Sequence, residues 1–291
     1  MAWKPLGTSL EEKFQDIELR LTELLASIPV NRFEREAGPF ILIAPEFHWA
    51  ATSPEQKAQQ VAIKRDYDRL HELLCVILAG ATHELQRDLQ SADNGFRKWL
   101  ELGRNWSISA DATRNLAKFT EDARALHEII HVIGAAGPHP IVVVPDTNSL
   151  MDHPDPVEYR ALVGQADFTF ALLPTVLAEL DNLKVVRTNQ PARKLAEKAI
   201  RRIKGWRKQG SLLDGVTVDK TITVRTFHEE PDMDNTLSWL DRTVMDDRIL
   251  ASVLQMQAER PGAAVVLVTN DINLLNKADA AGIQAAEFSE A

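Results

Sequence analysis

Hydrophobic side chains in the first half of the chain recur at alternating spacings of three and four, which is the spacing of one face of an α-helix. Helices that each carry one apolar stripe can bury these stripes against one another, which predicts an antiparallel helical bundle over residues 1–138. A stripe at heptad spacing could instead form a dimer seam, but all three stripes share the pattern, which favours the bundle. The stripes are Leu10, Phe14, Ile17, Leu21, Leu24 and Ile28; Ile63, Tyr67, Leu70, Leu74, Ile77 and Ala81; and Leu116, Phe119, Ala123, Leu126, Ile130 and Ile133.

Nearly all of residues 1–138 have the helical pattern. A short apolar run bounded by prolines, Phe40–Ala44, is the one interruption of the helical pattern. Ser53 and Gln56 have the spacing of a capping box, with Pro54 in the first turn, so a helix is expected to begin there. The predicted bundle is compatible with oligomerisation, regulation or substrate selection.

From Ile141 onward the pattern changes to short apolar strands that alternate with helical segments. This alternation predicts a parallel α/β sheet flanked by helices in a second domain, residues 139–291, beginning near Gly137-Pro138-His139-Pro140. The expected strands are Ile141–Val144, Phe168–Leu172, a β segment over Val216–Phe227, 264–268 and 283–286. The expected helices include one that starts at Pro174 and continues, through a break near Gln190-Pro191, into the basic helix, and two more at 247–259 and 272–281.

Two of these strands end in a carboxylate. Asp146 follows the first strand and Asp271 follows the strand at 264–268. The carboxyl ends of parallel strands meet at one edge of the sheet, so both acids should lie close together there. Carboxylates held close together repel one another, and a divalent cation is the usual reason for such an arrangement.

Three further acids fit the same site. Glu179 lies about one turn into the helix that starts at Pro174, and Asp247 opens the helix 247–259, where its neighbour Asp246 could serve instead. Each acid also has an ordinary structural interpretation. Asp146 can start a turn, Asp247 can cap a helix, and Glu179 can occupy a solvated edge.

Four segments in this order resemble the signature segments of PIN-domain nucleases: Pro145–Leu150, Pro174–Leu180, Asp246–Leu250 and Val268–Leu275. The long insertion between the second and third segments is similar to the larger PIN domains of RNA-decay factors and PhoH-linked proteins. The resemblance covers about residues 140–288, whereas residues 1–138 resemble no family that we recognise.

The resemblance implies a metal-dependent ribonuclease in which Asp146, Glu179, Asp247 and Asp271, with Asp246 as a further candidate, hold Mg²⁺ or Mn²⁺. Hard divalent cations prefer carboxylate and water oxygens, and a bound ion lowers the pKa of its water. Asn148, Thr269 and Asn270 would orient carboxylates or waters. The implied substrate is single-stranded RNA, cut internally to leave a 5′-phosphate and a 3′-hydroxyl.

The formal net charge of −9 argues against non-specific nucleic-acid binding by the whole chain. Between Lys184 and Lys208, however, ten basic residues face a single acid, Glu197. This segment could position RNA phosphates, or it could be a solvated helix face in which Trp206 packs inward. The candidate RNA-binding residues are Lys184, Arg193, Lys194, Arg201 and Arg202.

A second motif suggests a different chemistry. His127-Glu128-Ile129-Ile130-His131 matches the helix motif of zinc proteases. Gly137 stands where a third histidine would be expected, and the preceding sequence has the pattern of a bundle. We therefore favour two histidines at the edge of a helix–helix packing surface and keep a zinc metalloprotease as the lesser alternative.

Cys75 is the single cysteine, so no intrachain disulfide can form, and its apolar surroundings predict a buried thiol. No apolar run approaches the length of a membrane span, so no membrane partner is expected and a cytoplasmic location fits. The sequence predicts a ribonuclease, with a non-catalytic RNA-binding or scaffold protein as the alternative. Self-association through the N-terminal helices is compatible with both.

Overall fold

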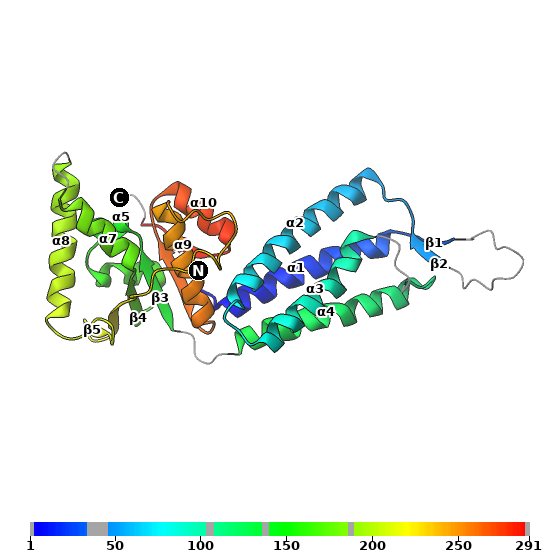
Figure 1. The fold of residues 1–291 in the computed structure, drawn as a ribbon, viewed down its shortest axis with the longest axis horizontal. Coiled ribbons are helices and arrows are strands. Elements are labelled where there is room, and N and C mark those ends of the chain that lie inside the picture. The colour runs from blue at the N-terminus through cyan, green and yellow to red at the C-terminus, as the bar shows by residue number, and fades with distance from the viewer. Residues whose placement is uncertain (1–2, 34–45, 103–107, 136–139, 186–188, 289–291) are drawn as a thin grey trace, which may run out of the picture. The chain divides into compact units, whose positions relative to one another are not determined.

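The computed structural model describes residues 3–33, 46–102, 108–135, 140–185 and 189–288 (Figure 1). The chain divides into two compact units, Gly7–Ile133 and Met1–Leu6 with Gly134–Ala291. The division therefore falls slightly before the predicted boundary at 138, and the first residues belong with the second unit. There the Lys4 amide donates to Gln284 Oε1 at 2.9 Å, and Gln284 Nε2 donates to the Lys4 carbonyl at 2.5 Å.

The first unit is a bundle of helices with one hairpin. Strand β1 (Val30–Phe33) pairs antiparallel with β2 (Glu46–Trp49). The sequence predicted helix throughout this region, and the hairpin corrects that expectation: strands of four residues are too short to show a period. The apolar run Phe40–Ala44 lies outside the described residues. The helices are α1 (Leu6–Ser27), α2 (Pro54–Ile77), α3 (His83–Glu101) and α4 (Ala112–Gly134).

Phe96 of α3 lies at the centre of this bundle and is fully buried. Its ring lies 5.3 Å from that of Phe14 on α1, 4.6 Å from Tyr67 on α2 and 5.6 Å from Phe119 on α4, measured between centroids. Because rings from all four helices meet in one core, the stripes pack against one another within the unit, as the bundle interpretation expected.

Helix α3 has a buried stripe that the sequence analysis did not single out. Its buried positions include Leu89, Phe96 and Trp99, but also the carboxylate of Asp93. A charged residue in the middle of the stripe hides the helical period. The predicted start of α2 is confirmed, since the Gln56 amide bonds Ser53 Oγ at 3.2 Å and the Ser53 amide bonds Gln56 Oε1 at 2.8 Å.

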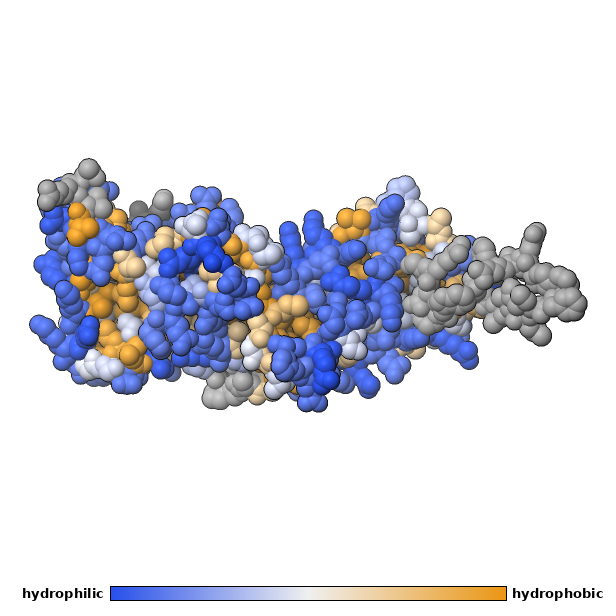
Figure 2. All heavy atoms as spheres, in the orientation of Figure 1, coloured by the Kyte–Doolittle hydropathy of each residue, from blue (hydrophilic) through white to orange (hydrophobic). Residues whose placement is uncertain are grey.

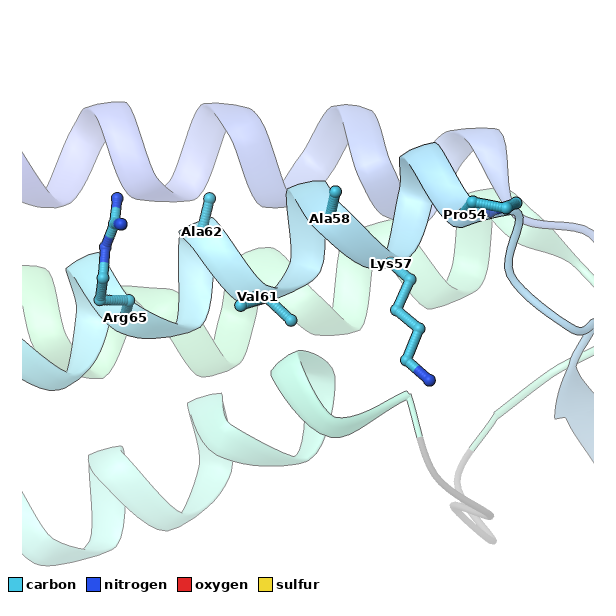
Figure 3. A pocket seen from close by; sticks show the side chains of 6 residues that line it. All are labelled: Pro54, Lys57, Ala58, Val61, Ala62 and Arg65. Atoms are coloured by element: carbon cyan, nitrogen blue, oxygen red, sulfur yellow. The ribbon is translucent and has the colours of Figure 1, made fainter.

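One side of α2 carries apolar side chains outside its buried stripe. Pro54, Lys57, Ala58, Val61, Ala62 and Arg65 line a hollow of about 490 Å³ (Figure 3), and Val61 is 62% exposed. Most of the visible surface of the helical unit is nevertheless hydrophilic (Figure 2). Cys75, farther along α2, is exposed rather than buried, because it lies outside the stripe of Leu70, Leu74 and Ile77.

The second unit is built on a six-stranded sheet in the order β5-β6-β4-β3-β7-β8. All neighbouring strands are parallel except β5, which is antiparallel to β6. This architecture confirms the predicted α/β fold. The strands are β3 (Ile141–Pro145), β4 (Phe168–Leu172), β5 (Val216–Val218), β6 (Ile222–Thr226), β7 (Ala264–Val268) and β8 (Gln284–Ala286).

The central strands β3 and β7 are buried along their whole length, which explains their continuous runs of valine, isoleucine and leucine. Helices connect the strands. They are α5 (Thr147–Asp152), the 3₁₀ turn η1 (Pro156–Tyr159), α6 (Arg160–Val163), α7 (Pro174–Leu183), α8 (Gln190–Arg207), α9 (Met245–Glu259) and α10 (Ile272–Ala281). Two helices, α7 and α8, follow Pro174, and α8 begins at Gln190, where the break before the basic helix was expected.

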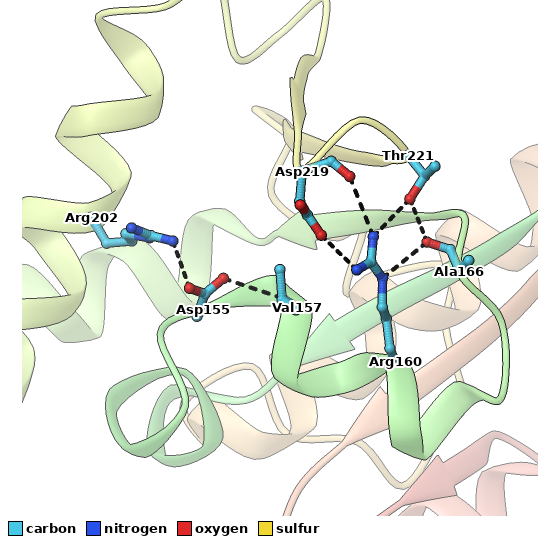
Figure 4. A network of polar contacts seen from close by, with 7 residues as sticks. All are labelled: Asp155, Val157, Arg160, Ala166, Arg202, Asp219 and Thr221. Carbon is cyan, nitrogen blue, oxygen red and sulfur yellow. Dashed lines mark hydrogen bonds and ion pairs between the residues drawn. The ribbon is translucent and has the colours of Figure 1, made fainter.

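The β segment expected over Val216–Phe227 is two strands, because a tight turn divides it. Asp219 and Lys220 have φ angles of 43° and 67°, which suit a hairpin turn of the primed type. Arg160 fastens this turn: its guanidinium reaches Asp219, Thr221 Oγ1 at 2.8 Å and the carbonyl of Ala166 (Figure 4). Arg160 thus links the hairpin of β5 and β6 to the segment before β4.

No helix in the described part of the chain combines the length and the hydrophobicity that crossing a bilayer requires.

Candidate metal and nuclease site

Asp146 and Asp271 follow adjacent strands and lie at the same edge of the sheet. Pro145 at the end of β3 is paired with Val268 at the end of β7, and the Asp146 amide donates to the Val268 carbonyl at 2.9 Å. Each aspartate caps the helix that follows: Asp146 Oδ1 accepts from the Ser149 amide at 2.7 Å, and Asp271 Oδ1 accepts from the Asn273 amide at 2.7 Å. The structural role expected for Asp146, the start of a turn, is therefore also present, whereas the cap expected at Asp247 is not, since the N-cap of α9 is Val244.

Thr269 links the two aspartates. Thr269 is completely buried. Its hydroxyl donates to Asp146 Oδ2 at 2.6 Å, and its Oγ1 atom also accepts from the Asp271 amide at 3.0 Å. With Ser149 holding the other oxygen, the Asp146 carboxylate is fixed in one orientation. This matches the orienting role expected of Thr269.

Glu179 reaches the same neighbourhood from α7. Its Oε2 atom accepts a hydrogen bond of 2.5 Å from Thr147 Oγ1, and Thr147 is the residue directly after Asp146. Thr147 is buried, whereas Glu179 is partly exposed. The sequence analysis did not identify Thr147, although its position beside Asp146 at the carboxyl edge of the sheet was a usable signal.

Asp246 and Asp247 have different surroundings. Asp247 is buried, pairs with the ammonium group of Lys277 at 2.5 Å and accepts from the Asp241 amide at 2.9 Å. Asp246 is only half-buried, and its pKa is raised, first by burial and then by the negative charges of Asp271, Asp146 and Asp247, against the opposing charge of Lys277. Asp246 thus lies near three other aspartates, and Lys277, whose charge opposes their effect on its pKa, is paired with Asp247.

The donor set of this edge suits a hard divalent cation. It consists of carboxylate and hydroxyl oxygens, and a cation there would relieve the repulsion among the aspartates that, after burial, raises the pKa of Asp246. Among the described residues, no three histidine, cysteine or acidic side chains are already gathered tightly enough to enclose an ion. The carboxylates thus lie around one edge of the sheet without forming a closed set of ligands, and Lys277 provides part of the positive charge there.

Of the other two residues expected to orient carboxylates, Asn270 is engaged elsewhere, and the role of Asn148 stays a prediction. Asn270 uses both ends of its amide to hold the backbone of Phe288, at 2.9 Å to its N–H and 3.3 Å to its carbonyl. Its role is to fasten the C-terminal segment, since alternate residues after a strand point in opposite directions. Asn148 is exposed on the first turn of α5, one residue from Thr147.

The basic helix α8 packs against α5 and α7, the helices that follow Asp146 and carry Glu179. Some of its expected RNA contacts are engaged in ion pairs: Arg193 with Glu197 at 2.9 Å and Arg202 with Asp155 at 2.6 Å. Lys184, before α8, pairs with Asp181 at 2.6 Å. Lys194 and Arg201 are exposed.

Trp206 is buried and meets the ring of Phe170 edge-on at 6.4 Å, so the expectation that it packs inward is confirmed. One side of α8 is therefore core, and charged side chains cover the rest. In the view of Figure 2, hydrophobic side chains show beside α8, while the surface over α9 and α10 is mostly hydrophilic.

The zinc-protease motif lies on α4 of the bundle, and its first histidine, His127, already has two carboxylate partners. His127 Nδ1 lies 2.9 Å from Glu11 Oε1 and Nε2 lies 2.8 Å from Glu18 Oε2, so neither ring nitrogen is open to a metal. Glu128 pairs with Arg124 and His131 is exposed. The placement of His127 at a helix–helix edge is confirmed, and the motif has no zinc-binding geometry.

A family model described as PIN domain matches residues 143–289, which is half of the chain. The chain therefore belongs to the PIN domain family, whose members are generally metal-dependent nucleases, and the predicted resemblance is confirmed. The matched residues include all five candidate acids. No curated protein matches the chain.

Proposed function

We propose that this protein is an endoribonuclease that cuts single-stranded RNA with the help of Mg²⁺ or Mn²⁺. The observation that carries the proposal is the grouping of Asp146, Asp246 and Asp271 at the carboxyl edge of a PIN-domain sheet, where burial, and after it the charges of the neighbouring aspartates, raises the pKa of Asp246. Such an electrostatically crowded edge is costly for the fold, and it is the arrangement that divalent-metal chemistry requires.

Within this proposal the residues have distinct roles. Asp146, Asp246 and Asp271, with Glu179 from α7, would hold the cation, and Asp247 would act through its ion pair with Lys277. The bound ion supplies an activated water and neutralises charge on the phosphate. Thr269 and Thr147 position Asp146 and Glu179 by the hydrogen bonds described above.

We propose that the exposed cations of α8, Lys194 and Arg201, contact the RNA backbone. They lie on the helix that packs against α5 and α7, and they make no ion pair among the contacts of the described residues. Cations of this kind give affinity without sequence preference. The ion-paired Arg193, Arg202 and Lys184 would contribute less, since a phosphate must displace their carboxylate partners.

The decisive experiment is cleavage of a labelled single-stranded RNA by the purified full chain in the presence of Mn²⁺ or Mg²⁺, with EDTA as the negative control. Asp146→Asn should lower the cleavage rate by at least about 100-fold, because a metal ligand loses its charge. Asparagine is also a good helix cap, so α5 should stay folded. Asp152→Asn, an exposed acid at the end of α5, is the matched control. Wild-type cleavage by Asp146→Asn would disprove the assignment.

A protein that binds RNA without cutting it is the main alternative. It would retain labelled RNA in a gel-shift assay with Mn²⁺ present but release no fragments over any incubation time. The same preparation incubated with zinc and a peptide substrate tests the protease. The engaged nitrogens of His127 predict no cleavage of the peptide.

A further inference from the structure

A cavity of about 320 Å³ lies in the α/β unit, separate from the acidic edge. Its walls come from the end of β4, the segment before β5, the end of β6 and the second half of α9. The residues that matter for its chemistry are Leu173, Leu213, Arg225, Phe227, Met256 and Arg260. None of them belongs to the candidate metal or RNA-binding set.

Two arginines converge on one aromatic ring in this cavity. The guanidinium carbon of Arg260 lies 4.8 Å from the centroid of the Phe227 ring, and that of Arg225 lies 6.0 Å from the same centroid. Arg225 is held in place by a 2.8 Å hydrogen bond from its Nε to the Leu213 carbonyl. The two like charges repel each other while the ring of Phe227 attracts each of them, so an anion placed between them would relieve the repulsion.

Arg225 and Arg260 lack the carboxylate partners that other arginines of the unit have. Arg160 and Arg202 each bind an aspartate within 2.6 Å. In the part of the chain that the structure describes, neither Arg225 nor Arg260 forms an ion pair with a carboxylate. The pKa of Arg260 is lowered, chiefly by burial and further by Arg225, against the opposing charge of Glu259.

Acidic side chains also line the cavity, but they have other partners. Glu259 accepts a hydrogen bond from Gln255 Nε2 at 3.0 Å, and Glu229 lies 3.6 Å from His228 Nε2. Asp214 is exposed at the rim. The cavity therefore keeps two guanidinium groups with unfilled donors beside an apolar wall of Leu213, Met256 and Phe227.

We propose that this cavity binds the phosphate group of a nucleotide, at a site distinct from the carboxylates. Guanidinium groups recognise phosphate through paired, charge-assisted hydrogen bonds. The apolar wall would contact the sugar and base, and a volume of about 320 Å³ is at the lower end of the range for small-molecule sites, which suits one nucleotide. The nucleotide could be free or be one unit of an RNA chain.

Helix α9 separates the two sites. Asp246 is in its first turn and Arg260 directly follows its last residue, which corresponds to roughly 20 Å along a helix axis. A single nucleotide in the cavity therefore cannot reach the carboxylates. The proposal does not depend on nuclease activity, because binding can be measured without a metal.

The test is calorimetric titration of the full chain in EDTA, so that no RNA is cut, with inorganic phosphate, uridine 5′-monophosphate and a single-stranded RNA oligonucleotide as separate ligands. Uridine 5′-monophosphate should bind more tightly than phosphate, and Arg260→Gln should weaken it at least about tenfold. Arg242→Gln, which removes an arginine paired with Asp234 elsewhere in the unit, is the matched control and should bind as the wild type does.

The variants separate binding from folding. Arg225→Gln also removes the bond to the Leu213 carbonyl, whereas Arg260→Gln removes no such bond. The thermal unfolding of both variants is therefore recorded. Binding of the RNA alone, lost in Arg260→Gln, would assign the site to a nucleotide unit within RNA. The proposal is overturned if no ligand binds, if phosphate binds as tightly as the nucleotide, or if Arg260→Gln and Arg242→Gln have equal affinities.

Discussion

The two units of this chain treat buried charge in opposite ways. In the helical unit, the buried carboxylate of Asp93 accepts from Tyr67 Oη at 2.9 Å and from Arg97 Nε at 2.8 Å, and His71 lies 3.5 Å away. In the α/β unit, Asp246 is half-buried and faces other acids, and its pKa is raised by burial and by their charges.

This difference separates structure from function. A buried charge that is fully compensated holds helices in register, and it can be explained by the fold alone. A group of like charges that persists at one edge of a sheet lowers the stability of the fold, so its presence points to a task other than stability. The buried charge of the bundle is thus explained by packing, whereas the acids of the α/β unit belong to the proposed chemistry.

The largest effect on stability should come from removing the compensation in the bundle. Arg97→Ala leaves Asp93 with Tyr67 as its remaining close donor and also frees Asp68, the second partner of Arg97. We expect the free energy of unfolding to fall by about 3 kcal/mol, measured by urea denaturation. Arg65→Ala, an exposed arginine on α2, should change it by less than about 0.5 kcal/mol. Equal effects of the two variants would remove one side of the comparison.

Variants of Asp246 and Asp247 test the charges of the α/β unit, with activity and stability measured separately. Asp246→Asn removes an uncompensated charge, so we expect cleavage of labelled RNA to fall at least about 50-fold with no loss of stability. Asp247→Asn breaks the pair with Lys277 and should lower stability by about 2 kcal/mol. Loss of stability in Asp246→Asn with unchanged cleavage would reverse this assignment.

A smaller effect is expected at the hairpin edge of the sheet. Arg160→Ala removes the contacts to Asp219, Thr221 and the Ala166 carbonyl (Figure 4), all of which are partly open to solvent. We expect a loss of about 1 kcal/mol in the free energy of unfolding, since exposed ion pairs contribute little. Hydrogen exchange should rise first in β5 and β6; a uniform rise over the sheet would argue against a local role.

The smallest effect should be a pH dependence in the bundle. Partial burial alone would lower the pKa of His127, but the hydrogen bonds and charges of Glu18 and Glu11 outweigh it and raise the pKa. The stabilisation is therefore fully present below the ordinary histidine pKa of about 6.5 and is lost as the pH rises through the higher folded-state value.

His127→Gln tests this. The wild type should lose up to about 1 kcal/mol of stability relative to the variant between pH 6 and pH 8.5. Parallel stability curves for the two proteins over that range would show that the pKa of His127 does not change on folding. His131→Gln, which changes an exposed histidine on the same helix, is the control.

Much of the fold could be predicted because the signals were local and long. The stripes of α1, α2 and α4 and the apolar runs of β3 and β7 each follow from one period over many residues. The hairpin of four-residue strands and the turn at Asp219 and Lys220 were not predicted, because short segments carry too little periodicity. The stripe of α3 was hidden by Asp93, whose partners come from α2 and from the next turn of α3.

For the site, the sequence by itself determined which acids are available and that Asp146 and Asp271 each end a strand of a parallel sheet, whereas the structure showed that these two strands are neighbours. Only the tertiary structure decided how they are used. In the structure, Asp247 pairs with Lys277, and Asn270 bonds the backbone of Phe288. Thr147 donates a hydrogen bond to Glu179, and Asp246 lies near other negative charges. Side-chain contacts between distant segments depend on helix rotation and strand register, and these are fixed by the packing of the whole unit rather than by any local stretch of sequence.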